Sequence, residues 1–158
     1  MLKFTESMVT FSEFPDEISL CINISRCPCH CEGCHSSYLA NDIGEPLYLE
    51  TVYDLIDKNE GITCLGLMGG DAEPLYINTI AKAIKDLYDI KVGWYSGRSH
   101  LAPEIDLQYF DYVKLGPYIE ERGGLDNPNT NQVMLEIDNT CGRPITKDIT
   151  SYFWRKSN

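Results

Sequence analysis

The sequence predicts a single α/β domain built around a mostly parallel sheet. Three observations support this fold class. Apolar runs typical of buried strands alternate with segments whose apolar residues recur at helical spacing. Glycine-containing turns end the predicted strands, which is where α/β sheets bind their ligands. The chain has 158 residues, enough for one compact domain with a core and too few for two. We therefore expect residues 1–158 to form one domain.

The individual elements follow from local patterns. The expected strands are apolar or β-branched runs bounded by turn residues, and they cover residues 18–24, 62–68, 91–95, 109–115 and 132–137. Two helices are expected, because apolar residues recur at helical spacing from Leu49 to Ile56 and again after Pro74. Residues 120–131 are rich in Gly, Asn and Pro, and this composition predicts a loop.

The composition is that of a folded, acidic protein. Hydrophobic residues make up 43% of the chain, and the net charge is −11. Affinity for nucleic acid comes mostly from clustered Lys and Arg, so this charge argues against a nucleic-acid partner. The sequence has no apolar run long enough for a bilayer, and residues 1–20 lack the pattern of a secretion signal. We expect a cytoplasmic protein with protein or small-molecule partners and no membrane association.

Four of the seven cysteines lie within eight residues, directly after the first predicted strand. An odd number of cysteines, crowded in this way, favours a metal site in a reducing compartment over a disulfide framework. Cys27, Cys31 and Cys34 have the spacing C-x3-C-x2-C. Cys29 is interpreted as a bystander, because only this choice of three cysteines gives that register.

The residues alone leave three interpretations of the cysteine cluster open. The first is a four-iron cluster, which normally takes four cysteines, so that Cys27, Cys31 and Cys34 would leave one iron open to an outside ligand. The second is structural zinc with His30 or His35 as a further ligand, although zinc sites usually use two separated ligand pairs and a second pair is lacking. The third is a redox-active cysteine set without a metal.

Two further turns follow predicted strands. Gly69, Gly70 and Asp71 end the strand at 62–68, and Ser96 follows the strand at 91–95. Glycines at a strand end let the backbone approach a ligand, and Asp71 could receive an ammonium group. The alternative is an ordinary turn in which Asp71 or Glu73 stabilises the next helix.

Together these motifs resemble the radical S-adenosylmethionine superfamily. The specific part is the C-x3-C-x2-C spacing after the first strand, and Gly-Gly-acidic after the second strand supports it. The small size and the Gly33-Cys34-His35 end of the motif make the chain most similar to the activating proteins of anaerobic ribonucleoside-triphosphate reductase. The commoner pattern of the superfamily has Glu followed by Pro, whereas Asp71-Ala72-Glu73-Pro74 stands here.

The resemblance implies an enzyme with an open or incomplete (βα) barrel, since a full barrel takes about 250 residues. Cys27, Cys31 and Cys34 would hold a [4Fe–4S] cluster, with S-adenosylmethionine on the fourth iron. An electron from a donor such as a flavodoxin would split the cofactor. The resulting 5′-deoxyadenosyl radical would take a hydrogen atom from a glycine of the partner, an anaerobic ribonucleotide reductase.

The resemblance also implies which residues contact S-adenosylmethionine. They lie at the end of the cysteine motif and after the next two strands: Gly33, Cys34, His35, Gly69, Gly70, Asp71 and Ser96. No side chain is expected to act as a catalytic acid or base, because the cofactor would break the bond. Two rival functions remain: a radical enzyme that acts on another glycyl-radical protein or a small molecule, and a non-catalytic zinc or electron-transfer module.

Overall fold

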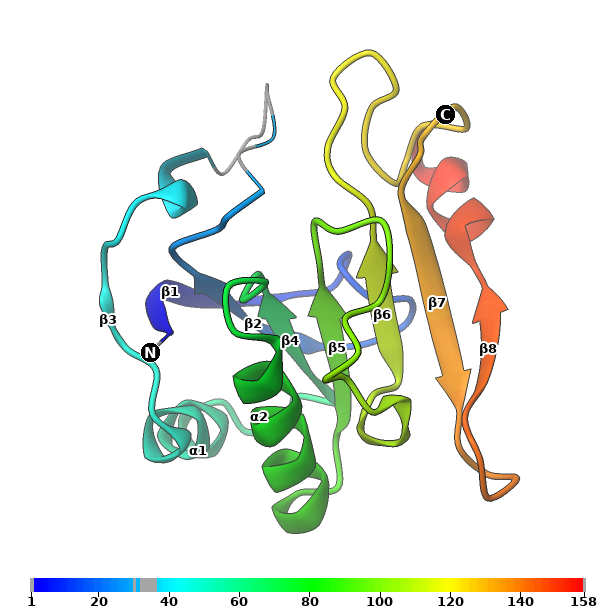
Figure 1. Cartoon of the computed structure of the whole chain (residues 1–158). Coiled ribbons are helices and arrows are strands. Elements are labelled where there is room, and N and C mark those ends of the chain that lie inside the picture. Colours follow the sequence, from blue (N-terminus) through cyan, green and yellow to red (C-terminus); the bar gives the residue numbers. More distant parts are fainter. Residues whose placement is uncertain (1, 30, 32–36, 158) are drawn as a thin grey trace.

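The computed structural model describes residues 2–29, 31 and 37–157, and within them one eight-stranded sheet carries two α-helices (Figure 1). The strands are β1 (Lys3–Thr10), β2 (Ser19–Ile24), β3 (Glu45–Pro46), β4 (Cys64–Met68), β5 (Lys91–Tyr95), β6 (Tyr112–Leu115), β7 (Val133–Asp138) and β8 (Ile145–Asp148). The helices are α1 (Leu49–Lys58) and α2 (Pro74–Leu87), with short 3-10 turns at η1 (Ser37–Ala40), η2 (Leu107–Tyr109) and η3 (Thr150–Ser157). None of the helices in the described residues is long and apolar enough to cross a membrane.

The sheet is mixed and open. Its order is β3-β1-β2-β4-β5-β6-β7-β8, so β3 and β8 are its two edges. β2, β4, β5 and β6 pair in parallel, whereas β1, β3, β7 and β8 pair antiparallel with their neighbours. The prediction of a mostly parallel sheet therefore holds only for the centre. Parallel neighbours need a crossover, and the helices that could supply one are confined to this central part of the chain.

Several predicted boundaries match the structure and others do not. The strand at 91–95 and the helix starts at Leu49 and Pro74 are confirmed. The run at 18–24 is the second strand, because β1 precedes it and pairs with it antiparallel. The run at 109–115 is strand only from Tyr112, since η2 occupies residues 107–109 and Asp106 accepts a hydrogen bond from the backbone N–H of Gln108.

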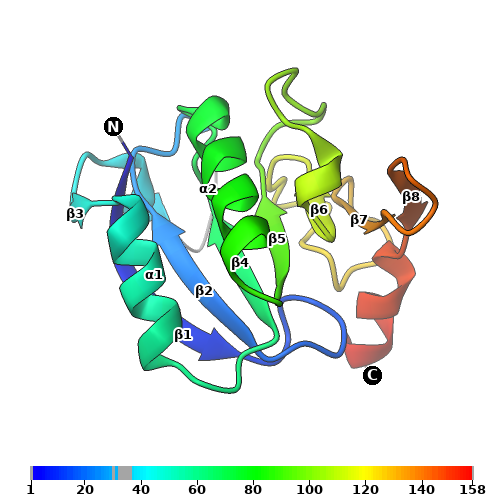
Figure 2. The same ribbon diagram turned by 90° about the horizontal axis from the view of Figure 1, so that it is seen from below.

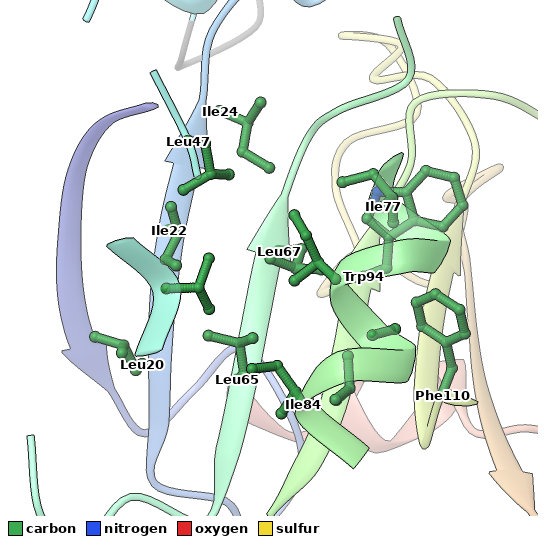
Figure 3. Close-up of a cluster of buried hydrophobic side chains, with 14 of the residues drawn as sticks. Leu20, Ile22, Ile24, Leu47, Leu65, Leu67, Ile77, Ile84, Trp94 and Phe110 are labelled. Atoms are coloured by element: carbon green, nitrogen blue, oxygen red, sulfur yellow. The ribbon is translucent and has the colours of Figure 1, made fainter. Parts of the chain in front are cut away.

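The main core lies between the sheet and the two helices, which cover the same face (Figure 2). The apolar stripe of α2 buries Ile77, Ile80 and Ile84 completely. These side chains meet alternate residues of the strands, among them Leu65 and Leu67 of β4 (Figure 3). The other residues of each strand point to the opposite face, as the period of two in a strand requires.

A second, smaller core fills part of that opposite face. The segment between β1 and β2 folds under the sheet and buries Phe14 completely. The Phe14 ring lies against Tyr95, with ring centroids 5.3 Å apart, and against Tyr112 at 5.4 Å. Cys21 and Cys64 are buried in the same cluster, as predicted. Burial raises the pKa of the Cys21 thiol to about 11 and that of Cys64 still further. Both thiols therefore stay protonated and pack as part of the core.

A buried carboxylate, that of Glu17, links residues at the amino ends of the central strands through hydrogen bonds. Glu17 is 8% exposed and accepts hydrogen bonds from Thr63 Oγ1 at 2.8 Å, Tyr112 Oη at 2.8 Å and Lys91 Nζ at 3.0 Å. The hydrogen bond with Glu17 raises the pKa of Lys91. These bonds satisfy the Glu17 carboxylate, which would otherwise be costly to bury. Buried side chains thus fill the amino-terminal end of the parallel strands. The sequence motifs lie at the opposite, carboxyl-terminal end of these strands.

Candidate functional site

The carboxyl ends of the four parallel strands lie together along one side of the sheet, and each predicted motif follows one of these strands (Figure 1). The cysteine segment follows β2, the Gly-Gly turn follows β4 and the Ser-Gly turn follows β5. Backbone hydrogen bonds continue between neighbouring segments beyond the strands, from Gly69 N–H to Tyr95 O at 3.1 Å and from Ser96 N–H to Lys114 O at 2.9 Å. The turns are therefore held in fixed positions relative to one another.

The cysteine segment is anchored where it leaves the sheet. Arg26 has a φ of 59°, which is uncommon for a residue with a side chain. Its N–H donates to Asn41 O at 3.0 Å, and the N–H of Cys27 donates to Leu39 O at 2.8 Å. These two bonds join the start of the cysteine segment to η1 and to Asn41 just after it.

Two of the three predicted metal ligands are among the described residues. The side chains of Cys27 and Cys31 are partly buried, and Cys31 Sγ accepts a hydrogen bond from the Tyr118 N–H at 3.3 Å. The predicted ligand Cys34 lies outside the described residues, as do Gly33 and His35. In the described part of the chain, no three His, Cys, Asp or Glu side chains are grouped as a metal site.

Asp71 joins three of the segments at this edge. Its side chain is 7% exposed. One carboxylate oxygen accepts from Ser96 Oγ at 2.6 Å, and the other accepts from the Gly97 N–H at 2.8 Å and lies 3.7 Å from Cys29 Sγ. The structure thus brings together Asp71 and Ser96, which are predicted site residues, and adds Cys29. The hydrogen bonds of Asp71 go to the turn after β5 and not to the start of α2.

Cys29 packs on the turn after β5. A Cβ atom added to Gly97 would lie only 2.7 Å from Cys29 Sγ, so this position needs a glycine for the two segments to meet. Burial, followed by the charge of Asp71, raises the pKa of the Cys29 thiol to about 12. Cys29 therefore contacts the site through its protonated thiol. The sequence does not predict the contact between Cys29 and Asp71, because the two residues are 42 positions apart in the chain.

The Gly-Gly turn approaches its surroundings closely. Gly70 has a φ of 96°, and a Cβ atom there would lie 2.4 Å from the Ile77 side chain. The carbonyl of Gly69 accepts a hydrogen bond from Trp94 Nε1 at 2.6 Å. Glu73, the other acidic residue of this motif, precedes α2 without a capping hydrogen bond from its side chain. Both predicted glycines are thus fixed at the strand edge, next to Asp71.

An open cleft of about 1110 Å³ is lined by Met68 and Tyr95, the residues just before these turns, whereas Asp71, Ser96 and the described cysteines do not line it. Its lining includes Asn23, Met68 and Tyr95, which follow one another across the ends of β2, β4 and β5 on the face without helices. β1 and the segment after it form one wall, and the loop at residues 123–128 forms another. Ligands of open α/β sheets bind outside the carboxyl ends of the strands, so this cleft is in the expected place.

Sequence reasoning missed the groups that line the β1 side of the cleft. Glu6 accepts hydrogen bonds from Tyr38 Oη at 2.5 Å and from Asn23 Nδ2 at 3.0 Å. These bonds lower the pKa of Glu6, which keeps this carboxylate ionised. Residues 3–10 do not alternate regularly between polar and apolar types, so no local signal marked this strand. Lys114 is a buried cation nearby: its Nζ donates to Gly116 O at 3.0 Å and lies 5.5 Å from the centre of the Tyr95 ring.

Replacing Asp71 with alanine is expected to lower the free energy of unfolding by about 1–3 kcal/mol, because the Gly97 N–H and Ser96 hydroxyl lose their partner in a buried place. The midpoint of urea unfolding measures this change. Asp86→Ala is the matched control, since Asp86 is 62% exposed and its ion pair with Lys82 is on the surface. Such a pair contributes about 0–1 kcal/mol. Equal stability of the two variants would contradict the role assigned to Asp71.

Comparison with known proteins found no family model, no curated protein and no solved structure that matches this chain.

Proposed function

We propose that this protein is a radical S-adenosylmethionine enzyme that generates a glycyl radical on an anaerobic ribonucleoside-triphosphate reductase. One observation carries the proposal. Segments far apart in the sequence, the cysteine loop, the Gly-Gly turn and the Ser-Gly turn, meet at one sheet edge around the Asp71 carboxylate. The C-x3-C-x2-C spacing gives that edge a donor set suited to an iron–sulfur cluster.

The described donors fit a [4Fe–4S] cluster held by Cys27, Cys31 and Cys34. Cys27 and Cys31 are partly buried, and the Tyr118 N–H points at the sulfur of Cys31. Hydrogen bonds to cysteine sulfurs are one of the means by which proteins tune such clusters. Cys29 fits the role of a neighbour better than that of a ligand, because its thiol contacts Asp71 and the Ser-Gly turn.

The finer fold proposed is an incomplete (βα) barrel. β2, β4, β5 and β6 lie side by side in chain order and in parallel, and α1 and α2 cover one face of them. The other face carries the open cleft at the carboxyl ends of these strands. An open sheet suits a protein substrate, because a loop of another protein has to reach the cofactor.

A [4Fe–4S] cluster held by Cys27, Cys31 and Cys34 would supply one-electron reduction of S-adenosylmethionine, and this cofactor chemistry would serve to remove one hydrogen atom from a glycine of the partner. The protein's own residues would bind and orient. Gly70, with its left-handed backbone, would let the turn pack closely on Ile77, and Asp71 would hold the Ser96 turn in place. The packed core around Phe14 would hold Met68 and Tyr95, which line the cleft, in place.

The proposal is tested with protein prepared without oxygen. Iron and sulfide are measured first, and the protein is then incubated with S-adenosylmethionine and a strong reductant such as dithionite. Formation of 5′-deoxyadenosine, detected by chromatography, is the expected result. A glycyl-radical signal by electron paramagnetic resonance in an added anaerobic ribonucleotide reductase would support the assigned partner. Equimolar zinc without sulfide would support the non-catalytic module and end the proposal.

A further inference from the structure

We infer that the cleft receives, beside the cofactor, an extended segment of the partner protein that carries basic side chains. This inference rests on the proposed function and names the chemistry of its protein substrate. It starts from the size of the cleft. Pockets for drug-sized ligands measure about 300–1,000 Å³, and this cleft, at about 1110 Å³ and open to solvent, exceeds that range. The space is therefore larger than a small molecule by itself requires.

The charge of the cleft selects the segment. Among the described residues, three charged side chains line the cleft, and all three are carboxylates: Glu6, Glu13 and Asp126. They lie on both walls, since Glu6 and Glu13 belong to β1 and the segment after it, and Asp126 belongs to the opposite loop. No lysine, arginine or histidine of the described residues lines the cleft. Complementary charge across an interface favours the correct partner and excludes acidic ones.

The positions of the carboxylates leave them able to receive a partner. Asp126 is exposed and Glu13 is partly exposed. The backbone carbonyl of Glu13 accepts a hydrogen bond from Tyr95 Oη at 2.7 Å, which fixes this wall residue against the end of β5. Lys114 is nearby, but its Nζ donates to Gly116 O and its side chain does not line the cleft. An arginine or lysine of the incoming segment would lie between these walls.

The walls also offer apolar contacts to an extended segment. Met8 of β1 lines the cleft and is 49% exposed, and Phe11, just after β1, is 71% exposed beside the lining residue Ser12. Tyr118 and Leu125 line the opposite side. Aromatic residues and methionine are enriched at protein interfaces. A segment that alternates basic and apolar side chains around its glycine matches both features.

The test compares two labelled synthetic peptides that differ only in charge. Both have a central glycine, and one has an arginine on each side, whereas the other has citrulline, which keeps the shape of arginine without its charge. Fluorescence anisotropy without oxygen measures their affinity for the full chain with S-adenosylmethionine present. We expect the arginine peptide to bind about three- to tenfold more tightly at low salt, from two partly exposed charge pairs. The difference should shrink as salt is added.

Variants assign the effect to the cleft. Glu13→Gln combined with Asp126→Asn is expected to remove the preference for the arginine peptide, and Asp86→Asn, an exposed charge on α2, is expected to keep it. Equal affinity of the two peptides for the unchanged chain, or binding of neither, would overturn the inference. So would a preference that survives the double variant.

The same preparation is assayed for 5′-deoxyadenosine, which separates this inference from the proposed function. Cofactor cleavage without peptide discrimination overturns the inference and supports the proposed function. Charge-dependent binding that the double variant abolishes, without cofactor cleavage, overturns the proposed function and supports a basic segment as the occupant of the cleft.

Discussion

Replacing Cys27 or Cys31 with alanine is expected to abolish formation of 5′-deoxyadenosine. The iron and sulfide bound to the protein are expected to fall to background. The reason is the number of ligands. A cluster held by three thiolates has no spare protein ligand, so loss of one leaves two irons without a cysteine. Iron and sulfide analysis, the brown absorbance of the cluster and chromatography of the reaction products measure the effect on the same sample.

Two controls separate ligation from the general loss of a thiol. Cys141→Ala removes an exposed cysteine far along the chain and is expected to leave iron content and product formation unchanged. Cys29→Ala is expected to retain iron, because this thiol lies against Asp71 and Gly97. If Cys29→Ala loses as much iron as Cys27→Ala, the assigned register of the three ligands is wrong.

Replacing Gly93 with alanine is expected to lower the free energy of unfolding by about 1–3 kcal/mol, the usual cost of overpacking a core. Gly93 lies in β5, and its Cα faces the Phe14 ring on the side where a side chain would stand. A Cβ atom there would lie 2.3 Å from Phe14 Cε1 and 2.4 Å from Cζ, and the ring is completely buried. Urea unfolding followed by circular dichroism measures the change.

A double-mutant cycle assigns this cost to the ring. Phe14→Ala by itself is expected to cost about 3–5 kcal/mol, because it empties the second core. In that background Gly93→Ala is expected to cost nothing or to stabilise by up to about 1 kcal/mol, since alanine restricts the unfolded chain more than glycine does. Gly124→Ala, where the nearest atoms to an added Cβ lie at 3.8 Å, is the control. Equal effects of Gly93→Ala in both backgrounds would contradict the contact.

Local signals predicted the central elements well. Lys91–Tyr95 is a strand with the predicted bounds, and α2 begins at Pro74, where the fixed φ of proline suits the first helical turn. Such features depend on residues next to one another in the chain. β8 shows the opposite case: all four of its residues are exposed, so no apolar pattern marks it, and it is a strand only because β7 lies beside it.

The sequence by itself determined which chemical groups stand at the ends of the parallel strands. The cysteines after β2, the glycines after β4 and Ser96 after β5 were predicted at one edge, because the carboxyl ends of parallel strands lie together. Only the tertiary structure decided which of these groups touch. Asp71 holds Ser96, Gly97 and Cys29, and Phe14 fits against Gly93, across separations that local patterns do not cover. Contacts of this kind are set by strand register and side-chain packing, which exist only once the whole sheet has formed.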